Sequence, residues 1–418
     1  MREDARVSPS RTPAPDPVRT ISDEERRTRL ARRHAIAPAH RTTDAVAAAR
    51  AVLAFHATEP ATVYLSAFAR VDGLTRDDVA RALYDDRTLV KQLAMRRTLF
   101  AFPRPLLPAV MGSAAARVAD QQRRQLARDL ERFGGARDGT ADVEAMAAEV
   151  VRLLGEGPST AQELGASSEL LALRLPMRPG VPDAPTMPVT PRLLTVLGAE
   201  GRVFRGSQSS GWRSSRPRWT LAEDWLGEVD PPLPETEGYA ALVRAWLERF
   251  GPGTEEDLVW WFGATKAAVR GALADLAAVP VALEDDSVGW VLADDVEPEP
   301  AVDPWVALLP VLDPTTMGWK QRDFYLGPHR PHLFDSAGNA GTTAWWDGRV
   351  VGGWHHGPDG EVVVALLEDV PREVAAALDA EADRLTEWLA GEQVGTVYPS
   401  PLMRERTGAP GPTRRGTS

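Results

Sequence analysis

The chain has 418 residues, 43% of them hydrophobic and 26% charged, which is the composition of a soluble globular protein large enough for more than one core. It contains no cysteine, which excludes disulfides, thiolate nucleophiles and cysteine-ligated metal centres, and no apolar run approaches the ~18 residues of a membrane span. The net charge of −11 is unevenly distributed, because residues 1–250 carry +4 and the remainder −15, so only the first part can present a basic face to an anionic partner.

The two ends of the chain differ from the rest in composition. Residues 1–20 are rich in Pro, Arg and Ser, and we expect them and residues 407–418 to be disordered. The N-terminus has no apolar centre of the kind that a secretory signal needs, so we expect a cytoplasmic protein.

The first unit, residues 21–135, has a helical pattern that ends in a strand. Apolar residues at helical spacing predict helices over 23–34, 42–53, 60–71, 74–83 and 88–95. Residues 98–102 have the composition of a strand. A helix pair followed by a β wing is the winged-helix pattern, so we predict a winged-helix unit that contains the catalytic segment described below.

The same order of elements recurs twice, in residues 136–230 and 236–298. In the second unit the sequence predicts helices over 143–154, 159–164 and 190–197 and wing strands over 202–205 and 218–221. In the third it predicts helices over 239–250, 253–258 and 264–276 and a hairpin of 281–283 with 290–292. The three units share a pattern rather than a sequence.

Residues 304–400 are predicted to form a small β domain, which follows an Asp/Glu/Pro-rich linker over 294–303. Asp347-Gly348 lies between two strand-forming runs, which indicates a tight hairpin turn. Asp359-Gly360 precedes a third strand, and residues 372–389 form a closing helix. The predicted fold class is therefore α+β, with three tandem winged-helix units followed by a small C-terminal β domain and its closing helix.

The segment that joins the wing strands of the second unit favours contact with DNA. Residues 201–220 contain no acidic residue and combine Trp212 with five arginines, which are Arg202, Arg205, Arg213, Arg216 and Arg218. Because arginine binds phosphate bidentately, we predict that these residues contact double-stranded DNA. The alternative is a solvated surface loop.

Two parts of the sequence, residues 42–103 and 305–368, resemble the winged-helix DNA glycosylases of the AlkZ/YcaQ type. The block from Trp305 to Trp354 carries the resemblance most specifically, and residues 54–70 add to it. The family usually holds its attacking water with Gln-x-Gln or Gln-x-Asp in the segment that corresponds to residues 54–60. In this sequence the two positions are His56 and Thr58.

The resemblance implies a monofunctional DNA glycosylase that excises N7-alkylated or bulky purine adducts by water-mediated cleavage, with interstrand crosslinks as further substrates. An N7-alkylated purine is already cationic, so the enzyme need only place a water and stabilise oxocarbenium charge. His56 would then accept a proton, Thr58 would share the water, and Glu59 would favour the cationic sugar. Alternatively, His56 caps the preceding helix, and Thr58 and Glu59 begin the next. No lysine lies near His56 in the sequence, so we expect no Schiff-base step.

Lys320 and Arg322, in the C-terminal block, are predicted to contact the DNA backbone, and the alternative is that they pair with Asp323.

Tandem winged helices also allow other functions. One is a DNA-binding regulator or damage binder without catalysis, and another is a protein-interaction scaffold.

The histidine pairs of the C-terminal block are weak candidates for metal ligands. His329 and His332 flank a proline-containing turn, and His355 and His356 are adjacent, but neither pair has a cysteine or a clear third ligand. We therefore expect no metal and no cofactor. The expected partner is double-stranded DNA, bound by a monomer that is associated with the nucleoid.

Overall fold

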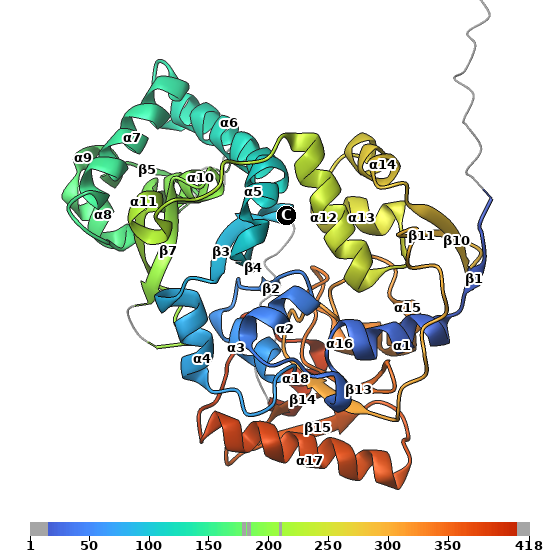
Figure 1. The fold of residues 1–418 in the computed structure, drawn as a ribbon. Coiled ribbons are helices and arrows are strands. Elements are labelled where there is room, and N and C mark those ends of the chain that lie inside the picture. Colours follow the sequence, from blue (N-terminus) through green and yellow to red (C-terminus); the bar gives the residue numbers. More distant parts are fainter. Residues whose placement is uncertain (1–15, 178–180, 182–184, 209–210, 408–418) are drawn as a thin grey trace, which may run out of the picture.

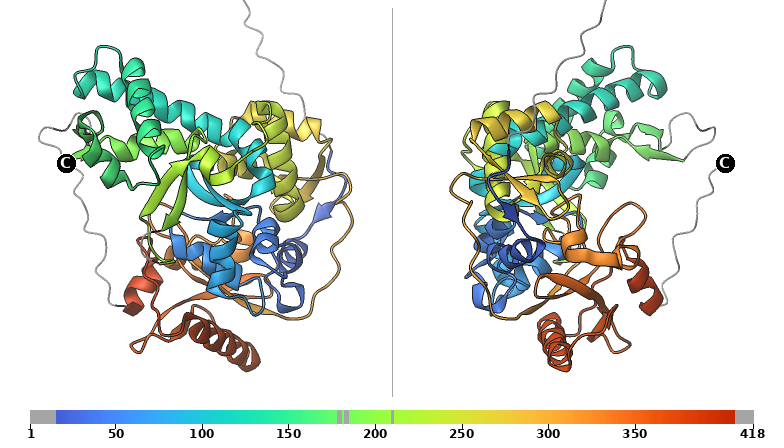
Figure 2. Two further views of the ribbon diagram at one scale, coloured as in Figure 1. Left: turned by 60° about the vertical axis from the view of Figure 1, so that its left-hand side comes forward. Right: turned by 90° about the vertical axis from the view of Figure 1, so that its right-hand side faces the viewer.

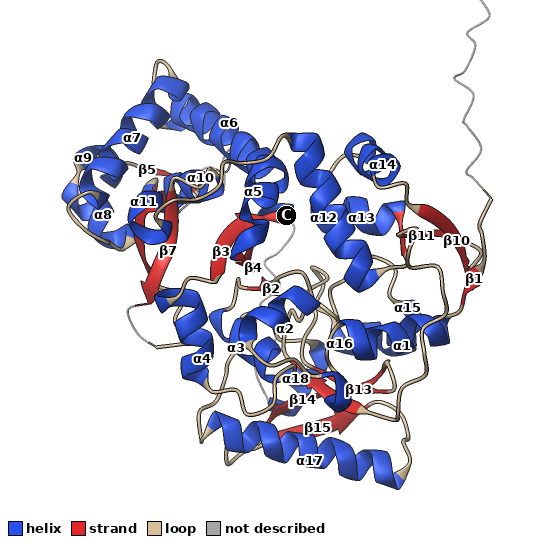
Figure 3. Cartoon of the chain, viewed as in Figure 1, coloured by secondary structure: helices blue, strands red, loops and turns tan. Residues whose placement is uncertain are grey.

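The N-terminal elements lie at the centre of the structure, between two upper lobes and a C-terminal base (Figure 1). This computed structural model describes residues 16–177, 181, 185–208 and 211–407. Helices predominate, and the strands form small separate sheets (Figure 3). Two further views show the same arrangement, with α17 (Arg372–Leu389) along the base (Figure 2).

The central region contains helices that alternate with short strands. Its elements are β1 (Thr20–Ile21), α1 (Asp23–Arg33), α2 (Ala45–Ala51), β2 (Phe55–His56), α3 (Pro60–Phe68), α4 (Arg76–Ala80), β3 (Leu89–Ala94) and β4 (Thr98–Pro103). Asp44 caps α2, as expected, by accepting hydrogen bonds from the backbone N–H groups of Val46 and Ala47 at 2.9 Å each. The helices predicted over 23–34, 42–53 and 60–71 are thus confirmed, with shorter bounds for the second and third.

Residues 88–95 form a strand, so the helix predicted there is wrong. β3 pairs antiparallel with β4 along its full length, and β2 pairs with the other edge of β4, which gives a sheet of order β2-β4-β3. Arg96 and Arg97 turn the chain between the two strands, with φ angles of 53° and 58°. The apolar residues Leu89, Val90 and Leu93 fit a helical spacing equally well, and pairing with neighbouring strands decides the outcome.

The disordered segment predicted for residues 1–20 extends too far, because its last residues are ordered. Val18 donates its backbone N–H to the carbonyl of Pro280 at 3.0 Å, and β1 pairs in parallel with β10 (Val279–Leu283). Residues 1–15 and 408–418 lie outside the described residues.

The second unit forms one upper lobe together with helices of residues 107–133, which the prediction placed in the first unit, and this lobe includes more elements than the sequence predicted. They are α5 (Leu107–Val110), α6 (Ala116–Phe133), α7 (Gly139–Leu154), α8 (Ala161–Ser167), α9 (Glu169–Ala172), β5 (Arg174–Pro176), β6 (Thr186–Pro188), α10 (Thr190–Ala199), β7 (Val203–Gln208), β8 (Pro217–Leu221) and α11 (Ala222–Leu226). The three predicted helices and both wing strands are confirmed as α7, α8, α10, β7 and β8.

The third unit forms the other lobe and matches its predicted elements. They are α12 (Glu235–Phe250), β9 (Gly253–Thr254), α13 (Glu255–Phe262), α14 (Lys266–Asp275), β10, and β11 (Val288–Val291). Thr254 caps α13 in a capping box with Asp257, through hydrogen bonds of 3.0 and 3.1 Å. That the three units are winged helices remains a prediction.

The C-terminal base contains a four-stranded antiparallel sheet in the order β12-β13-β14-β15. Its elements are β12 (Val306–Leu309), α15 (Asp323–Leu326), α16 (Arg330–Leu333), β13 (Thr343–Trp346), β14 (Arg349–His356), β15 (Val362–Leu366), α17 and α18 (Pro401–Thr407). Asp347 and Gly348 have φ angles of 44° and 79°, as a type I′ hairpin turn requires. Short helical turns complete the chain: η1 (Pro38–His40), η2 (Arg81–Asp85), η3 (Met95–Arg97), η4 (Arg104–Leu106), η5 (Met111–Ala115) and η6 (Gly327–His329).

The central region, the third unit and the C-terminal base share one hydrophobic core, which extends from Leu30 to Leu402, whereas the second unit has a core of its own. A fully buried ion pair between Arg70 and Asp313 lies where the central region meets the base, with N–O distances of 2.7 and 2.9 Å. The C-terminal block therefore supports the N-terminal elements directly, and the predicted boundaries of the third unit and of the C-terminal domain do not separate independent cores.

Candidate active site

The predicted catalytic segment follows β2 and leads into α3. His56 pairs with Phe100 of β4, and the backbone N–H of Ala57 donates to the carbonyl of Leu99 at 2.8 Å, so the strand geometry continues past the end of β2. Side chains alternate between the two faces of a strand. His56 and Ala57 therefore point to opposite faces of the small sheet.

His56 lies in the interior with 6% of its surface exposed. Its ring packs edge-on against Phe100 at 5.2 Å between centroids, and Nδ1 makes no hydrogen bond to the described residues. Burial, together with the charge of Arg96, lowers the pKa of His56 to about 3, so the imidazole is neutral but weakly basic. The alternative role as a helix cap is wrong, because α2 ends at Ala51 and His56 belongs to β2.

Thr58 is exposed at the rim of a small cavity. The walls include Ala57 and Leu99, Lys91 of β3 and Arg205 of β7. The cavity volume is about 20 Å³, which is room for one water molecule. Because Lys91 is only 8% exposed, it forms the inner wall, whereas Thr58 faces the solvent.

Lys91 brings an amine to this cavity without a carboxylate partner. Its Nζ donates to the phenolic oxygen of Tyr84 at 2.6 Å. Burial, followed by the nearby charge of Arg205, lowers the pKa of Lys91 to about 7. A lysine thus lies beside the catalytic segment, because β3 pairs with β4, which in turn pairs with β2. No lysine lies near His56 along the sequence, as inferred, but in the folded chain Lys91 lies beside the catalytic segment.

Arg205 connects the wing of the second unit to the same cavity. Its guanidinium lies over the ring of Trp219, 5.1 Å from the centroid, and burial lowers its pKa to about 10. The two cations at the cavity, Lys91 and Arg205, give it a positive character that suits an anionic ligand such as phosphate.

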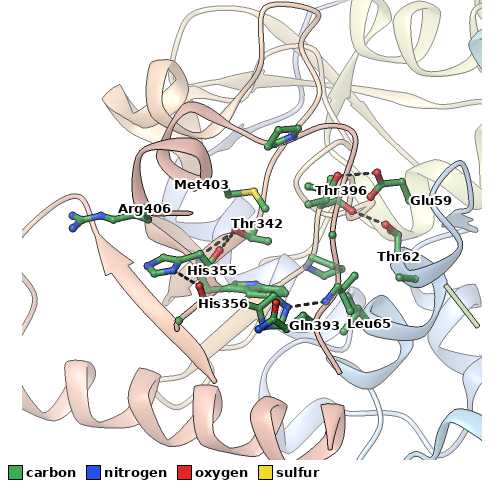
Figure 4. A pocket seen from close by; sticks show the side chains of 18 of the residues that line it. Glu59, Thr62, Leu65, Thr342, His355, His356, Gln393, Thr396, Met403 and Arg406 are labelled. Carbon is green, nitrogen blue, oxygen red and sulfur yellow. Dashed lines mark hydrogen bonds between the residues drawn. The ribbon is translucent and has the colours of Figure 1, made fainter. Parts of the chain in front are cut away.

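Glu59 lines a second and larger cavity, which Thr58 does not line (Figure 4). One carboxylate oxygen, Oε1, accepts from the hydroxyl of Thr396 at 2.8 Å and from the N–H of Val397 at 2.6 Å. Burial raises the pKa of Glu59. Glu59 is the N-cap residue of α3 and Pro60 is the first residue of that helix, so the alternative that Thr58 and Glu59 begin the next helix is confirmed, although the Glu59 side chain makes no capping hydrogen bond.

The second cavity has a volume of about 580 Å³, the size of a small-molecule site. It lies among α3, β14, α18 and the segment after α17, and its polar walls include His355, His356 and Arg406 (Figure 4). The three predicted catalytic residues therefore occupy three environments: His56 the interior, Thr58 the small cavity and Glu59 the large one.

A family model for the AlkZ-like DNA glycosylases matches residues 49–388. The chain belongs to the AlkZ-like DNA glycosylase family. This membership supports a DNA glycosylase function and DNA as the partner. Among solved structures, the DNA glycosylase AlkZ of Streptomyces sahachiroi matches with a TM-score of 0.69 and 20% identity, over 89% of this chain and 97% of that one, which shows a common fold. No curated protein matches the sequence.

For this AlkZ-like glycosylase, the predicted DNA contacts on the wing vary in their availability. Trp212 donates Nε1 to Glu392 at 3.1 Å and packs against Tyr64, and Arg213 contacts Glu392 at 3.1 Å, so both hold the wing against the segment after α17. Arg218 contacts the carbonyl of Pro158 and the carboxylate of Glu163. Arg202 lies at 3.8 and 3.9 Å from the carboxylates of Glu144 and Glu200, and Arg216 is exposed.

The two predicted contacts in the C-terminal block have different positions. Lys320 is exposed and pairs with Glu256. Arg322 is 3% exposed, donates to the carbonyl of Trp319 at 2.6 Å and lies over the ring of Phe334, so the predicted contact of this side chain with the DNA backbone does not fit its burial. Neither side chain pairs with Asp323, and that alternative is wrong.

The structure adds basic residues that the sequence analysis did not select. Arg96 and Arg97, at the turn of the β3–β4 hairpin, line a hollow of about 280 Å³ with Arg117 of α6 and with Gln121 and Gln122. No acidic residue lines this hollow. In the sequence these residues could have been found from the adjacent Arg96 and Arg97. Their position at a turn is apparent only once residues 89–103 are known to form a hairpin.

The histidine pairs do not form a metal centre in the part of the chain that the structure describes. His329 Nε2 contacts Glu368 at 2.8 Å, while His332 is exposed. His356 accepts from the N–H of Val394 at 3.0 Å through Nε2. No group of three or more potential ligands occurs among the described residues.

None of the helices in residues 16–177, 185–208 and 211–407 has the length and apolarity to cross a membrane.

Proposed function

We propose that this AlkZ-like glycosylase excises N7-alkylated or bulky purine adducts from double-stranded DNA, crosslinked purines included, by hydrolysis of the N-glycosidic bond. The observation that carries this proposal is the water-sized cavity behind Thr58. It offers a place for a nucleophilic water at an exposed rim, where the sugar of bound DNA can approach.

The chemistry needs a positioned water and a proton acceptor, but no acid for the leaving base. A purine alkylated at N7 departs as a neutral base, so its own charge drives the bond cleavage. Thr58 is positioned to orient the water through its hydroxyl group. Lys91, with a pKa of about 7, can accept the proton in its neutral form at physiological pH. We assign this role to Lys91 rather than His56, because a pKa of about 3 makes His56 a poor base.

The two sides of the catalytic segment have complementary charges. Arg205 at the small cavity suits a DNA phosphate, and the wing residues Arg216 and Arg218 would be further phosphate contacts. The Glu59 carboxylate lines the large cavity, so it can favour the positive charge of an alkylated purine that enters there. The large cavity beside Glu59 has room for the bulky part of an adduct.

A non-catalytic DNA-binding protein is the second candidate, because His56 and Thr58 replace the glutamines of the family pattern. Incubation with a duplex that carries one 7-methylguanine, and with a duplex that carries a bulkier N7 adduct, separates the two. Release of the base with formation of an abasic site supports the glycosylase. Salt-dependent binding without release from either duplex supports the regulator or damage binder, and absence of salt-dependent binding supports a scaffold.

A further inference from the structure

The Lys91 amine has the surroundings of a nucleophile rather than of a structural cation. Its Nζ donates a hydrogen bond to Tyr84, whose own pKa is raised by burial, so that partner stays neutral. No carboxylate of the described residues contributes to the charge state of Lys91. A buried lysine without a counter-ion loses its proton at a lower pH than an exposed one, and neutral amines of this kind form Schiff bases with carbonyl carbons.

We propose that Lys91 gives this protein a second activity, the cleavage of DNA strands at abasic sites. The proposal extends the proposed function, and it uses that function only to place the damaged sugar at the rim of the Thr58 cavity. It replaces the expectation, drawn from the sequence, that the reaction ends with base removal.

The geometry follows from the position of the attacking water. Lys91, which is buried, and Thr58, which is exposed, line the same water-sized cavity, so a water held there would lie between the Lys91 side chain and a sugar C1′ at the exposed side. After hydrolysis, the oxygen of this water has become the C1′ hydroxyl. The Lys91 amine then neighbours C1′ itself, which becomes an aldehyde carbon when the abasic sugar opens.

The chemical steps balance without an oxidant or a cofactor. The lone pair of the Lys91 Nζ attacks the C1′ aldehyde, a C–N bond forms and the C–O bond breaks, and one water leaves; a proton taken up from solvent gives the protonated Schiff base. A water molecule takes a proton from C2′, the electron pair moves toward the iminium, and the C3′–O bond breaks with the phosphate as leaving group. Water then hydrolyses the imine, which returns the amine and leaves an unsaturated aldehyde on one strand end and a 5′-phosphate on the other.

The test uses the full-length protein and a duplex with one preformed abasic site, so base release is not required. Borohydride in the reaction reduces a Schiff base to a stable secondary amine, which links protein to DNA. Because the chain has three lysines, Lys91, Lys266 and Lys320, peptide mass spectrometry of the linked wild-type protein identifies the attacking residue without any substitution.

The expected result is a covalent adduct on Lys91 and, without borohydride, a cleaved strand with a 5′-phosphate end. Lys91→Met and Lys91→Arg should lose the adduct, whereas Lys266→Arg, an exposed position on α14, should keep it. No adduct, or an adduct on Lys266, Lys320 or the N-terminal amine, would overturn the proposal. Failure of 7-methylguanine release with an intact Lys91 adduct would instead overturn only the proposed glycosylase substrate.

Discussion

The pH dependence of base excision tests the role of Lys91 as the proton acceptor. With a pKa of about 7, the amine is half neutral at pH 7 and about one-tenth neutral at pH 6, so kcat/KM should fall about fivefold over that unit and about tenfold per unit below it. The charged or titratable groups that face the amine are Tyr84 and Arg205. Tyr84 stays protonated and Arg205 stays charged across this range, so neither produces the decline.

The assay is release of 7-methylguanine from a duplex between pH 5.5 and 8.5, measured for wild type, Lys91→Met and Lys91→Arg. Both variants should lose about 10²–10⁴-fold in kcat/KM, the usual contribution of a general base, and should lose the decline near pH 7. DNA phosphates near Arg205 should shift the decline in kcat to higher pH than that in kcat/KM. A wild-type profile that is flat from pH 5.5 to 8 would refute the reasoning, and a decline that persists in Lys91→Met would assign it to another group.

Three further predictions concern stability and the neighbouring residues. Asp313→Ala should lower the free energy of unfolding by about 3–5 kcal/mol in urea denaturation, because it leaves the buried guanidinium of Arg70 unpaired. The control Asp323→Ala, at an exposed position, should lower it by less than about 1 kcal/mol. Equal losses in the two variants would contradict this prediction. Buried His34 and His56 have pKa values below the unfolded value near 6.5, so the unfolded state takes up protons first as the pH falls. Each histidine should therefore lower the free energy of unfolding by about 2 kcal/mol between pH 7 and pH 5. If His56→Gln loses as much stability over this range as the wild type, His56 does not contribute to the loss. Glu59→Gln keeps an acceptor for Thr396 and Val397, so the Tm should not change. Because the variant removes the negative charge, base release should slow on the order of tenfold. An unchanged rate would remove Glu59 from the mechanism.

Local chemistry made much of the fold predictable from the sequence. Asp347-Gly348 supplies the two left-handed residues of its hairpin turn, and Thr254 with Asp257 supplies the cap of α13. The closing helix was predicted with its observed bounds, Arg372–Leu389, because its apolar residues repeat at helical spacing before Ala390 and Gly391 turn the chain. In each case the deciding contacts lie within a few residues of one another.

The candidate site was less predictable, because its neighbours are brought together by strand pairing. Residues 88–95 were predicted as a helix, and on a helix Lys91 would not have been placed beside β2. The sequence indicated Thr58 and Arg205 separately, and the structure puts them at one cavity. His56 and Glu59 are adjacent to Thr58 in the chain, yet the alternation of the strand and the start of α3 direct their side chains elsewhere. The core shared by the central region, the third unit and the C-terminal base could not be predicted either, because the composition of the sequence changes at boundaries across which the side chains pack together.

The central claim is that the attacking water is held at Thr58. The most direct test is the single-turnover rate of 7-methylguanine release by Thr58→Val, which removes the hydroxyl but keeps the shape of the side chain, with DNA affinity measured in parallel. We expect a rate at least about tenfold lower than that of the wild type, with an unchanged Kd for the duplex. Release at the wild-type rate by Thr58→Val would contradict it.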